Sequence, residues 1–265
     1  ADSEYIASGG SDDKVYLFSR VSSTPLWSYT TEGNVYSVAI SADGKYLTAG
    51  SGLSDDKLYF FDKDNSTPLW SYSTGGTYVN TVAISADGSY IAAGTGAIER
   101  AVYLFDKDSS TPLWSYTVGN TVHSVAISSN GEYIVAGSAD DRVYLFDKDG
   151  SAPLWSYVTG SDVRSVAISA DGKYIAAGSE YDYKVYYFNT DSGTPLWNYT
   201  TGSIVYSTAI SADGEHIAAG SKDNKVYLFI YIAEDDDGGG GIPAPSLAAA
   251  VAAVAVIALR RPRKP

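Results

Sequence analysis

The sequence predicts an all-β fold, a β-propeller of about six four-stranded blades whose first and last blades are incomplete, followed by a C-terminal apolar helix. The first observation is a repeat, because Trp27, Trp70, Trp114, Trp155 and Trp197 follow one another at intervals of 43, 44, 41 and 42 residues. The second is that each repeat contains four short apolar segments separated by turn residues. A repeat of about 40–45 residues with four strands is typical of a propeller blade.

The four segments of one repeat are taken here as strands a, b, c and d. They cover residues 35–41 (VYSVAIS), 45–51 (KYLTAGS), 57–61 (KLYFF) and 68–72 (PLWSY). Val, Ile, Tyr, Phe and Trp dominate them, and the connections SADG and FDKDNST have the composition of tight turns. A four-stranded meander cannot bury both of its faces alone, so neighbouring units must stack, either around a ring or as an open β-solenoid. In a ring, strand a is innermost and strand d is outermost.

The ends of the repeat region are incomplete. Strands b and c occur six times each, but strands a and d occur only five times, since residues 1–5 align with the a–b turn and no PLWSY follows Phe229. We therefore expect further d and a strands upstream, which would give six or seven blades. We divide the chain into a propeller (1–233), an acidic Gly/Pro linker (234–246) and a membrane-anchor helix with a basic tail (247–265).

Composition excludes several classes of function. The formal net charge of −13 opposes binding to a phosphate backbone, so we expect no nucleic-acid partner. Cys is absent, and the two His residues, His123 and His216, lie in different strands of different repeats, so we expect no metal site, no cofactor and no catalytic residues. The Asp-rich turns, such as those at Asp62 and Asp43, fit solvated loops and capped tight turns.

Two families resemble these repeats. SADGKYIAAGS, at residues 169–179, followed by a strand of the KVYLFD type, such as RVYLFD at residues 142–147, is similar to the WD-repeat pattern, although the Gly-His pair of that pattern is absent and Phe replaces the Trp of its terminal Trp-Asp. FDKDSSTPLW, residues 105–114, resembles the tryptophan-docking repeat of pyrroloquinoline-quinone (PQQ)-like propellers, with an acid or amide eight residues before Trp70, Trp114, Trp155 and Trp197. This resemblance implies that the Trp residues lock each blade to its neighbour. The Trp residues to which we assign this role are Trp27, Trp70, Trp114, Trp155 and Trp197.

The positions that differ between repeats are candidates for recognition. In strand a only the second residue is chemically diverse, and the b–c loops vary as well. Both features lie at the same mouth of a propeller, where aromatic residues and Arg supply binding energy. The predicted partner-binding residues are Tyr36, Asn80, His123, Arg164, Tyr206, Arg100, Tyr181 and Tyr183. Arg100 and Arg164 would be local cations suited to a carboxylate or sulfate group.

The composition of the C-terminal segment predicts the cellular location of the protein. Residues 247–259 are all Ala, Val, Leu or Ile, and the basic segment RRPRKP follows them. Such a run is marginal for a membrane span, but linker, apolar helix and basic cluster together resemble a C-terminal sorting signal. The positive-inside rule then places the propeller outside the cell. A helix docked on the propeller is the alternative.

From these features we expect a non-catalytic, extracytoplasmic binding or scaffold propeller, monomeric and tethered to the membrane through residues 247–259. Its partner would be a protein or an extracellular polymer bound at the face that carries the strand-a starts and the b–c loops. The alternatives are a quinoprotein-like or lyase-type propeller enzyme, with active groups lining the channel, and a structural component of the cell envelope.

Overall fold

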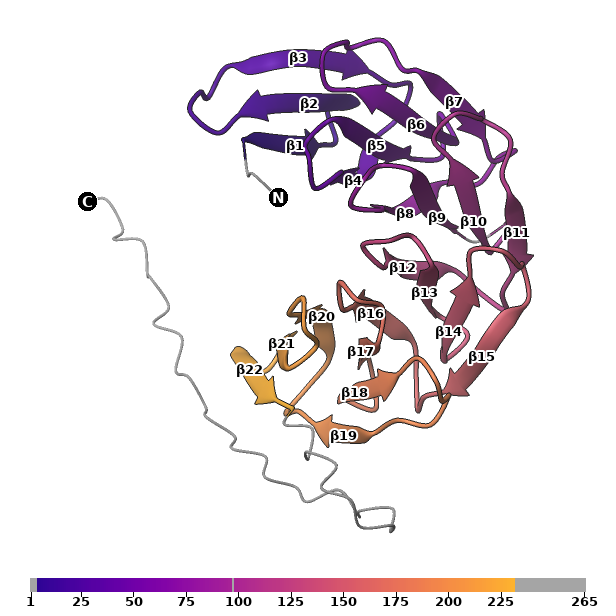
Figure 1. The fold of residues 1–265 in the computed structure, drawn as a ribbon, viewed down its shortest axis with the longest axis vertical. Coiled ribbons are helices and arrows are strands. Elements are labelled where there is room, and N and C mark those ends of the chain that lie inside the picture. The colour runs from indigo at the N-terminus through magenta and orange to yellow at the C-terminus, as the bar shows by residue number, and fades with distance from the viewer. Residues whose placement is uncertain (1–3, 97, 232–265) are drawn as a thin grey trace.

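The computed structural model describes residues 4–96 and 98–231, which form six antiparallel sheets arranged around an arc (Figure 1). The first sheet contains β1 (Tyr5–Gly9), β2 (Lys14–Ser19) and β3 (Pro25–Thr30). The second contains β4 (Val35–Ile40), β5 (Tyr46–Ser51), β6 (Lys57–Asp62) and β7 (Trp70–Ser73). The third contains β8 (Val79–Ile84), β9 (Tyr90–Thr95), β10 (Ala101–Asp106) and β11 (Trp114–Thr117).

The remaining three sheets repeat this order. The fourth contains β12 (Val122–Ile127), β13 (Tyr133–Ser138), β14 (Arg142–Asp147) and β15 (Pro153–Val158). The fifth contains β16 (Val163–Ile168), β17 (Tyr174–Ser179), β18 (Lys184–Asn189) and β19 (Trp197–Thr200). The sixth contains β20 (Val205–Ile210), β21 (His216–Ser221) and β22 (Lys225–Ile230). The all-β prediction and the a-b-c-d order within each repeat are therefore confirmed.

The first and last sheets of the arc are incomplete, as the sequence predicted. The inner strands β4, β8, β12, β16 and β20 follow the inside of the curve, and the sheets β1–β3 and β20–β22 stand apart at its two ends (Figure 1). The first sheet has no inner strand and the sixth has no outer strand among the described residues. Strands that would complete these two sheets are thus not among residues 4–231. The predicted C-terminal helix falls outside the described residues.

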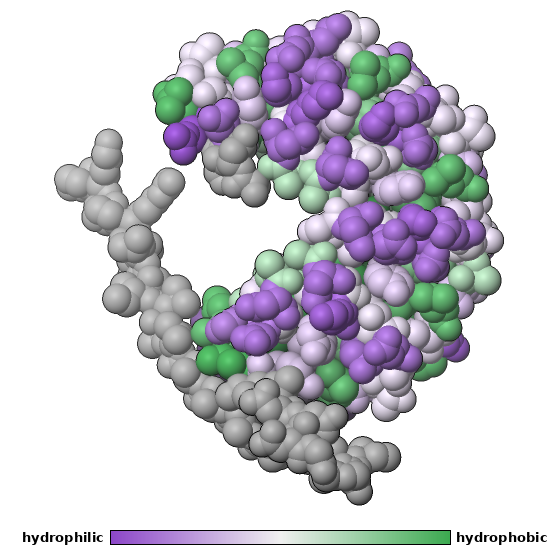
Figure 2. Space-filling view, viewed as in Figure 1, coloured by the Kyte–Doolittle hydropathy of each residue, from purple (hydrophilic) through white to green (hydrophobic). Residues whose placement is uncertain are grey.

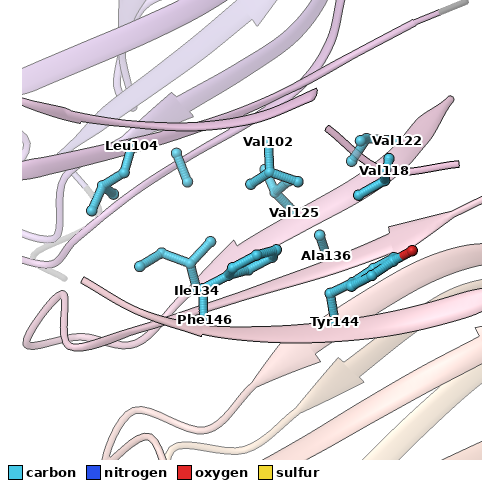
Figure 3. Close-up of a cluster of buried hydrophobic side chains, with 10 residues drawn as sticks. Val102, Leu104, Val118, Val122, Val125, Ile134, Ala136, Tyr144 and Phe146 are labelled. Atoms are coloured by element: carbon cyan, nitrogen blue, oxygen red, sulfur yellow. The ribbon is translucent and has the colours of Figure 1, made fainter. Parts of the chain in front are cut away.

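The core lies between the sheets, because each sheet is apolar on both faces. Figure 3 shows one such layer, in which Val102 and Leu104 of β10 face Ile134 of β13 and Phe146 of β14. All four side chains are fully buried. Strand c is therefore apolar at successive positions instead of alternating, as a strand covered on both faces must be. Stacking of like sheets accounts for the near-identical sequences of the repeats, since equivalent side chains pack against one another between each pair of neighbouring sheets.

The a–b turns have the geometry that SADG predicts. Asp43 Oδ1 accepts hydrogen bonds from Ser41 Oγ at 2.6 Å and from the Lys45 amide at 3.0 Å. Gly44 has a φ of +69°, a backbone conformation that Gly adopts without a Cβ clash. The hydrogen bond from Ser41, followed by that from the Lys45 amide, lowers the pKa of Asp43.

A Gly in strand b allows the sheets to approach closely. A Cβ at Gly9, Gly50, Gly94, Gly137 or Gly178 would lie under 3.0 Å from the first Val of the next sheet's inner strand. Real Cβ atoms essentially never come so near a neighbour, so the Ala-Gly-Ser end of strand b reflects sheet-to-sheet contact. The spacing between inner strands is thus determined by a Gly–Val pair in every layer.

Candidate functional site

The candidate site is one mouth of the arc, called here the variable mouth. It consists of the first residues of the inner strands, the loops between strands b and c, and the loops between strands d and a. The meander topology brings these segments to the same end of every sheet. All eight predicted partner-binding residues belong to this mouth, whereas the a–b and c–d turns lie at the opposite mouth.

A β-bulge explains why one position of strand a is free to vary. In β4 the register passes from the pair Val35–Ser51 to the pair Ser37–Gly50, so Tyr36 has no partner residue of its own. The same shift recurs in β8, β12, β16 and β20. Bulges release a side chain from the regular alternation of a strand and change its direction. The residues at the bulge position are Tyr36, Asn80, His123, Arg164 and Tyr206.

Tyr36 and Tyr206 offer the most accessible surface among the bulge residues, with 49% and 53% exposure. The Tyr36 ring meets the Tyr78 ring edge to face, with centroids 5.7 Å apart. It also lies against Gly52, where a Cβ would come within 3.2 Å of Tyr36 Cζ. Tyr36 is therefore held by its neighbours while half of its surface remains available for contact. The sequence analysis did not identify Tyr78.

Asn80 takes part in a contact between sheets. Its Nδ2 donates a hydrogen bond to the Val122 carbonyl of the next inner strand at 2.9 Å. The amide therefore links β8 to β12. Because this bond uses one N–H of the Asn80 amide, Asn80 has fewer hydrogen-bonding groups left for a partner than the sequence alone predicts.

His123 and Arg164 form one cluster with two acids, and the sequence analysis missed both acids. Arg164 Nε and Nη2 each lie 2.5 Å from Glu180 Oε2, and the Glu180 side chain is only 6% exposed. His123 Nε2 lies 3.7 Å from Asp162 Oδ2. Burial, and then the nearby Arg164 charge, lowers the pKa of His123 from its ordinary value. His123 is therefore neutral at pH 7, and Glu180 already neutralises the Arg164 charge that the sequence offered to a carboxylate or sulfate.

This pairing predicts a stability effect for Arg164→Ala. Removing the guanidinium leaves the buried Glu180 carboxylate without its counter-charge, so we expect a loss of about 1–3 kcal/mol of unfolding free energy. Urea unfolding of the variant at neutral pH measures this loss. Arg142→Ala is the control, since the Arg142 side chain donates to the exposed Ser156 Oγ and forms no ion pair within residues 4–96 and 98–231. An unchanged midpoint for Arg164→Ala would show that Glu180 does not depend on this partner.

Arg100 and Tyr183 occupy an unusual backbone position. Each is the last residue before strand c and has a positive φ, +53° and +60°. The other four repeats have Asp or Asn at this position. Asp and Asn tolerate the left-handed conformation better than Arg or Tyr. Arg100 donates from Nη1 to the Gly119 carbonyl at 3.2 Å, and Tyr181 in the same loop as Tyr183 is 65% exposed. Local backbone strain of this kind gathers at binding sites.

A repeated tyrosine–carboxylate pair supports every b–c loop. In each sheet a Tyr of strand c donates its hydroxyl to an acid four residues earlier, for example Tyr144 to Asp140 at 2.6 Å. Asp140 Oδ2 also accepts the Gly119 amide, which ties the b–c loop to the d–a loop. The six pairs are Asp12–Tyr16, Asp55–Tyr59, Glu99–Tyr103, Asp140–Tyr144, Asp182–Tyr186 and Asp223–Tyr227. An acid four residues before this Tyr in all six repeats was the signal that could have revealed them.

The Trp residues lie at the opposite end of the sheets and bridge neighbouring sheets. Four indole Nε1 atoms donate to a backbone carbonyl in the c–d turn of the next sheet, at 2.6 to 2.9 Å. The pairs are Trp27–Lys63, Trp70–Lys107, Trp114–Lys148 and Trp155–Thr190. Trp197 instead packs its ring between Tyr187 and Phe229, with centroids 5.1 and 5.0 Å away.

Potential metal ligands gather at one place in the described residues. Asp213 and Glu215, in the a–b turn of the sixth sheet, and His216, the first residue of β21, present ligand atoms within 4.8 Å of one another. All three residues are exposed, and exposed acidic groups are common without a metal ion. The group lies away from the variable mouth. Among residues 4–96 and 98–231 there is also no helix with the length and apolarity needed to cross a membrane.

Comparisons with known proteins agree with the repeat pattern. A family model described as outer membrane protein assembly factor BamB, of the PQQ-like class, matches residues 98–231, and one described as WD domain, G-beta repeat matches residues 23–62. No curated protein matches the chain. Among solved structures 1835 chains match, so the fold is widespread. One is a chain of the crystal structure of the mitotic checkpoint complex, 20% identical over 86% of this chain and 70% of that chain, with a TM-score of 0.74.

Proposed function

Because the chain belongs to the family of PQQ-like β-propeller repeat proteins, we propose that it is a non-catalytic binding scaffold that recognises a protein or polymer partner through its variable mouth. One observation carries the proposal. A bulge in each of the five described inner strands places a Tyr, Asn, His or Arg side chain at the same mouth, while the packing positions of the strands stay nearly constant. Conserved packing with variable exposed residues is the arrangement expected of a recognition surface on a repeat scaffold.

The chemistry of the mouth supports binding over catalysis. Its exposed groups include aromatic rings, such as Tyr36, Tyr181 and Tyr206, and the apolar Leu53 at 60% exposure. The charged groups that lie deeper, such as Arg164 and Glu180, are paired with each other. Exposed Tyr side chains on a supported backbone give contact area at low entropic cost. A catalytic site would instead need a nucleophile or acid with a free base beside it.

A double substitution tests the mouth. We expect Tyr36→Ala with Tyr206→Ala to weaken partner capture by about tenfold or more, since exposed aromatic anchors typically contribute over 1 kcal/mol each. Capture is measured with immobilised protein in an envelope extract of the source organism, with mass spectrometry of the bound material. Leu26→Ala with Leu154→Ala, both 54% exposed on outer strands, is the matched control. Equal capture by all three proteins would refute a role for the mouth.

We also propose an extracytoplasmic location with a membrane tether at residues 247–259. The thirteen-residue apolar run and the basic residues after it support this. The full chain should sediment with membranes after alkaline carbonate washing, and a chain ending at residue 233 should stay in the supernatant. Release of the full chain by the wash would rule out the tether.

A further inference from the structure

Two Asn-x-Ser/Thr triplets of the chain belong to none of the features described above. They are Asn65-Ser66-Thr67 and Asn198-Tyr199-Thr200. This triplet is the acceptor sequence of N-glycosylation, in which the Asn amide receives an oligosaccharide. Because so short a motif also arises by chance, the structural role of each Asn decides whether its triplet is a candidate modification site.

Asn65 has a structural role that explains its presence. It lies in the c–d turn of the second sheet, and its Oδ1 accepts the Thr67 amide at 2.9 Å. Ser22 and Ser109 occupy the same place in two other c–d turns, and their Oγ atoms accept the equivalent amides at 3.0 Å. Either kind of side-chain oxygen can cap an amide two residues later. Pro68, directly after Thr67, also restricts the backbone of this triplet.

Asn198 lies instead on the outer strand of the fifth sheet. β19 ends that sheet, pairs with β18 and follows the outside of the arc (Figure 1). The Tyr199 ring packs on the sixth sheet, with centroids 5.6 Å from Tyr227 and 5.3 Å from Phe229. Because side chains alternate along a strand, Asn198 and Thr200 point to the opposite face, where both are exposed. The two residues that define the acceptor triplet thus lie together at the surface.

Neither packing nor hydrogen bonding explains the presence of Asn198. Its side chain has no hydrogen-bonded partner among residues 4–96 and 98–231. Asn is among the residues that are depleted in strands, so the strand itself does not favour it. The other four outer strands have Ser at this position, namely Ser28, Ser71, Ser115 and Ser156. Asn198 is therefore a departure from the repeat for which the described contacts give no reason.

The position of β19 suits a bulky polar group. β17 and β18 separate it from the inner strand β16, so a group on Asn198 lies away from the variable mouth. The face of the arc shown in Figure 2 is a mixture of hydrophilic and hydrophobic groups, as expected of a surface in contact with solvent. A glycan is large and solubilising and belongs on such a surface. Modification of Asn198 would therefore leave the variable mouth open to its partner.

We propose that Asn198 carries an N-linked glycan, transferred from an oligosaccharide donor that is linked through phosphate to a polyprenyl lipid. In this transfer the Asn198 Nδ2 forms a bond to the anomeric carbon of the first sugar. The bond between that carbon and the phosphate oxygen breaks, the lipid phosphate leaves with the bonding electron pair, and the amide loses one proton. The Thr200 hydroxyl is the second group of the acceptor triplet. The inference rests on the extracytoplasmic location proposed above, because N-glycosylation marks exported proteins.

Mass spectrometry of the full chain purified from its source organism tests the site. We expect the peptide that contains Asn198 to carry an added mass and to release sugar fragment ions, and the peptide that contains Asn65 to have its unmodified mass. Asn198→Ser gives β19 the residue of the other outer strands, so it should abolish the added mass without changing the melting temperature. Thr200→Val, which copies Val158, should also abolish it, whereas Thr200→Ser, which copies Ser73, should retain it. Asn65→Ser is the matched control and should leave the added mass in place.

An unmodified Asn198 in the purified full chain would overturn the proposal. Protease added to intact cells reports the location separately. If the protease digests the propeller and Asn198 is unmodified, the glycan is refuted and the extracytoplasmic location stands. If the propeller is protected and Asn198 is unmodified, both proposals fail. An added mass that persists in Asn198→Ser and disappears in Asn65→Ser would assign the glycan to the turn, which would also overturn the proposal.

Discussion

Trp114→Ala is expected to lower the unfolding free energy by about 3 kcal/mol or more. The indole packs against Phe146 of the next sheet, with ring centroids 5.3 Å apart, and its Nε1 donates to the Lys148 carbonyl at 2.8 Å. The substitution removes this ring contact and this hydrogen bond, each of which joins the third sheet to the fourth. Because domains are stable by only about 5–15 kcal/mol, such a loss is a large part of the total. Urea unfolding followed by circular dichroism measures it.

Two comparisons separate packing from hydrogen bonding. Leu113→Ala, at an adjacent residue that is 52% exposed, should change stability by less than about 0.5 kcal/mol. Trp114→Phe keeps an aromatic ring and should cost about 1 kcal/mol for the lost bond. Trp197→Phe should cost less than that, since the hydrogen bonds of the described residues include none from its Nε1. Equal losses for Trp114→Phe and Trp197→Phe would contradict the contribution of the indole hydrogen bond.

Stability is expected to fall steeply above about pH 10, the ordinary pKa of Tyr. Burial, followed by the hydrogen bond to a carboxylate, raises the pKa of Tyr59, Tyr103, Tyr144 and Tyr186. Burial also raises the pKa of Tyr187. Below the unfolded pKa these phenols are protonated in both states. As the pH rises further, only the unfolded chain releases the protons, so it binds fewer protons than the native state and unfolding becomes more favourable.

Urea midpoints measured between about pH 8 and about pH 11 test this expectation. The midpoint should be flat up to about pH 9 and should then fall with each step. Tyr144→Phe removes one of the five groups, so its decline above about pH 10 should be shallower than that of the parent protein. A midpoint independent of pH over this range would mean that the buried phenols ionise as freely in the folded protein as in the unfolded chain.

Most of the fold could be predicted from the sequence because one packing problem recurs in every repeat. The Trp interval, the turn residues and the apolar segments located the strands and their order. The incomplete first and last sheets could be predicted as well, from the count of strand segments. The Gly of strand b was visible in the sequence as part of Ala-Gly-Ser, but its reason appears only when the Val of the next sheet is seen above it.

The candidate site could be predicted in its position but not in its electrostatics. Comparison of the repeats identified the second residue of strand a as variable, and the bulge at Tyr36 and its equivalents gives the physical reason. The pairing of Arg164 with Glu180 depends on a contact across 16 residues, which repeat comparison does not reveal. The tyrosine–carboxylate pairs are constant in every loop, so a comparison of the positions that differ between repeats does not reveal them.

Site-specific photo-cross-linking tests the central claim, that partners bind at the variable mouth, most directly. A photoreactive phenylalanine derivative replaces Tyr181, at 65% exposure in a mouth loop, or Leu154, at 54% exposure on an outer strand. Both proteins are irradiated in the same envelope extract and the adducts are separated by mass. We predict a discrete adduct from position 181 and none from position 154. A discrete adduct from position 154 alone would contradict the account.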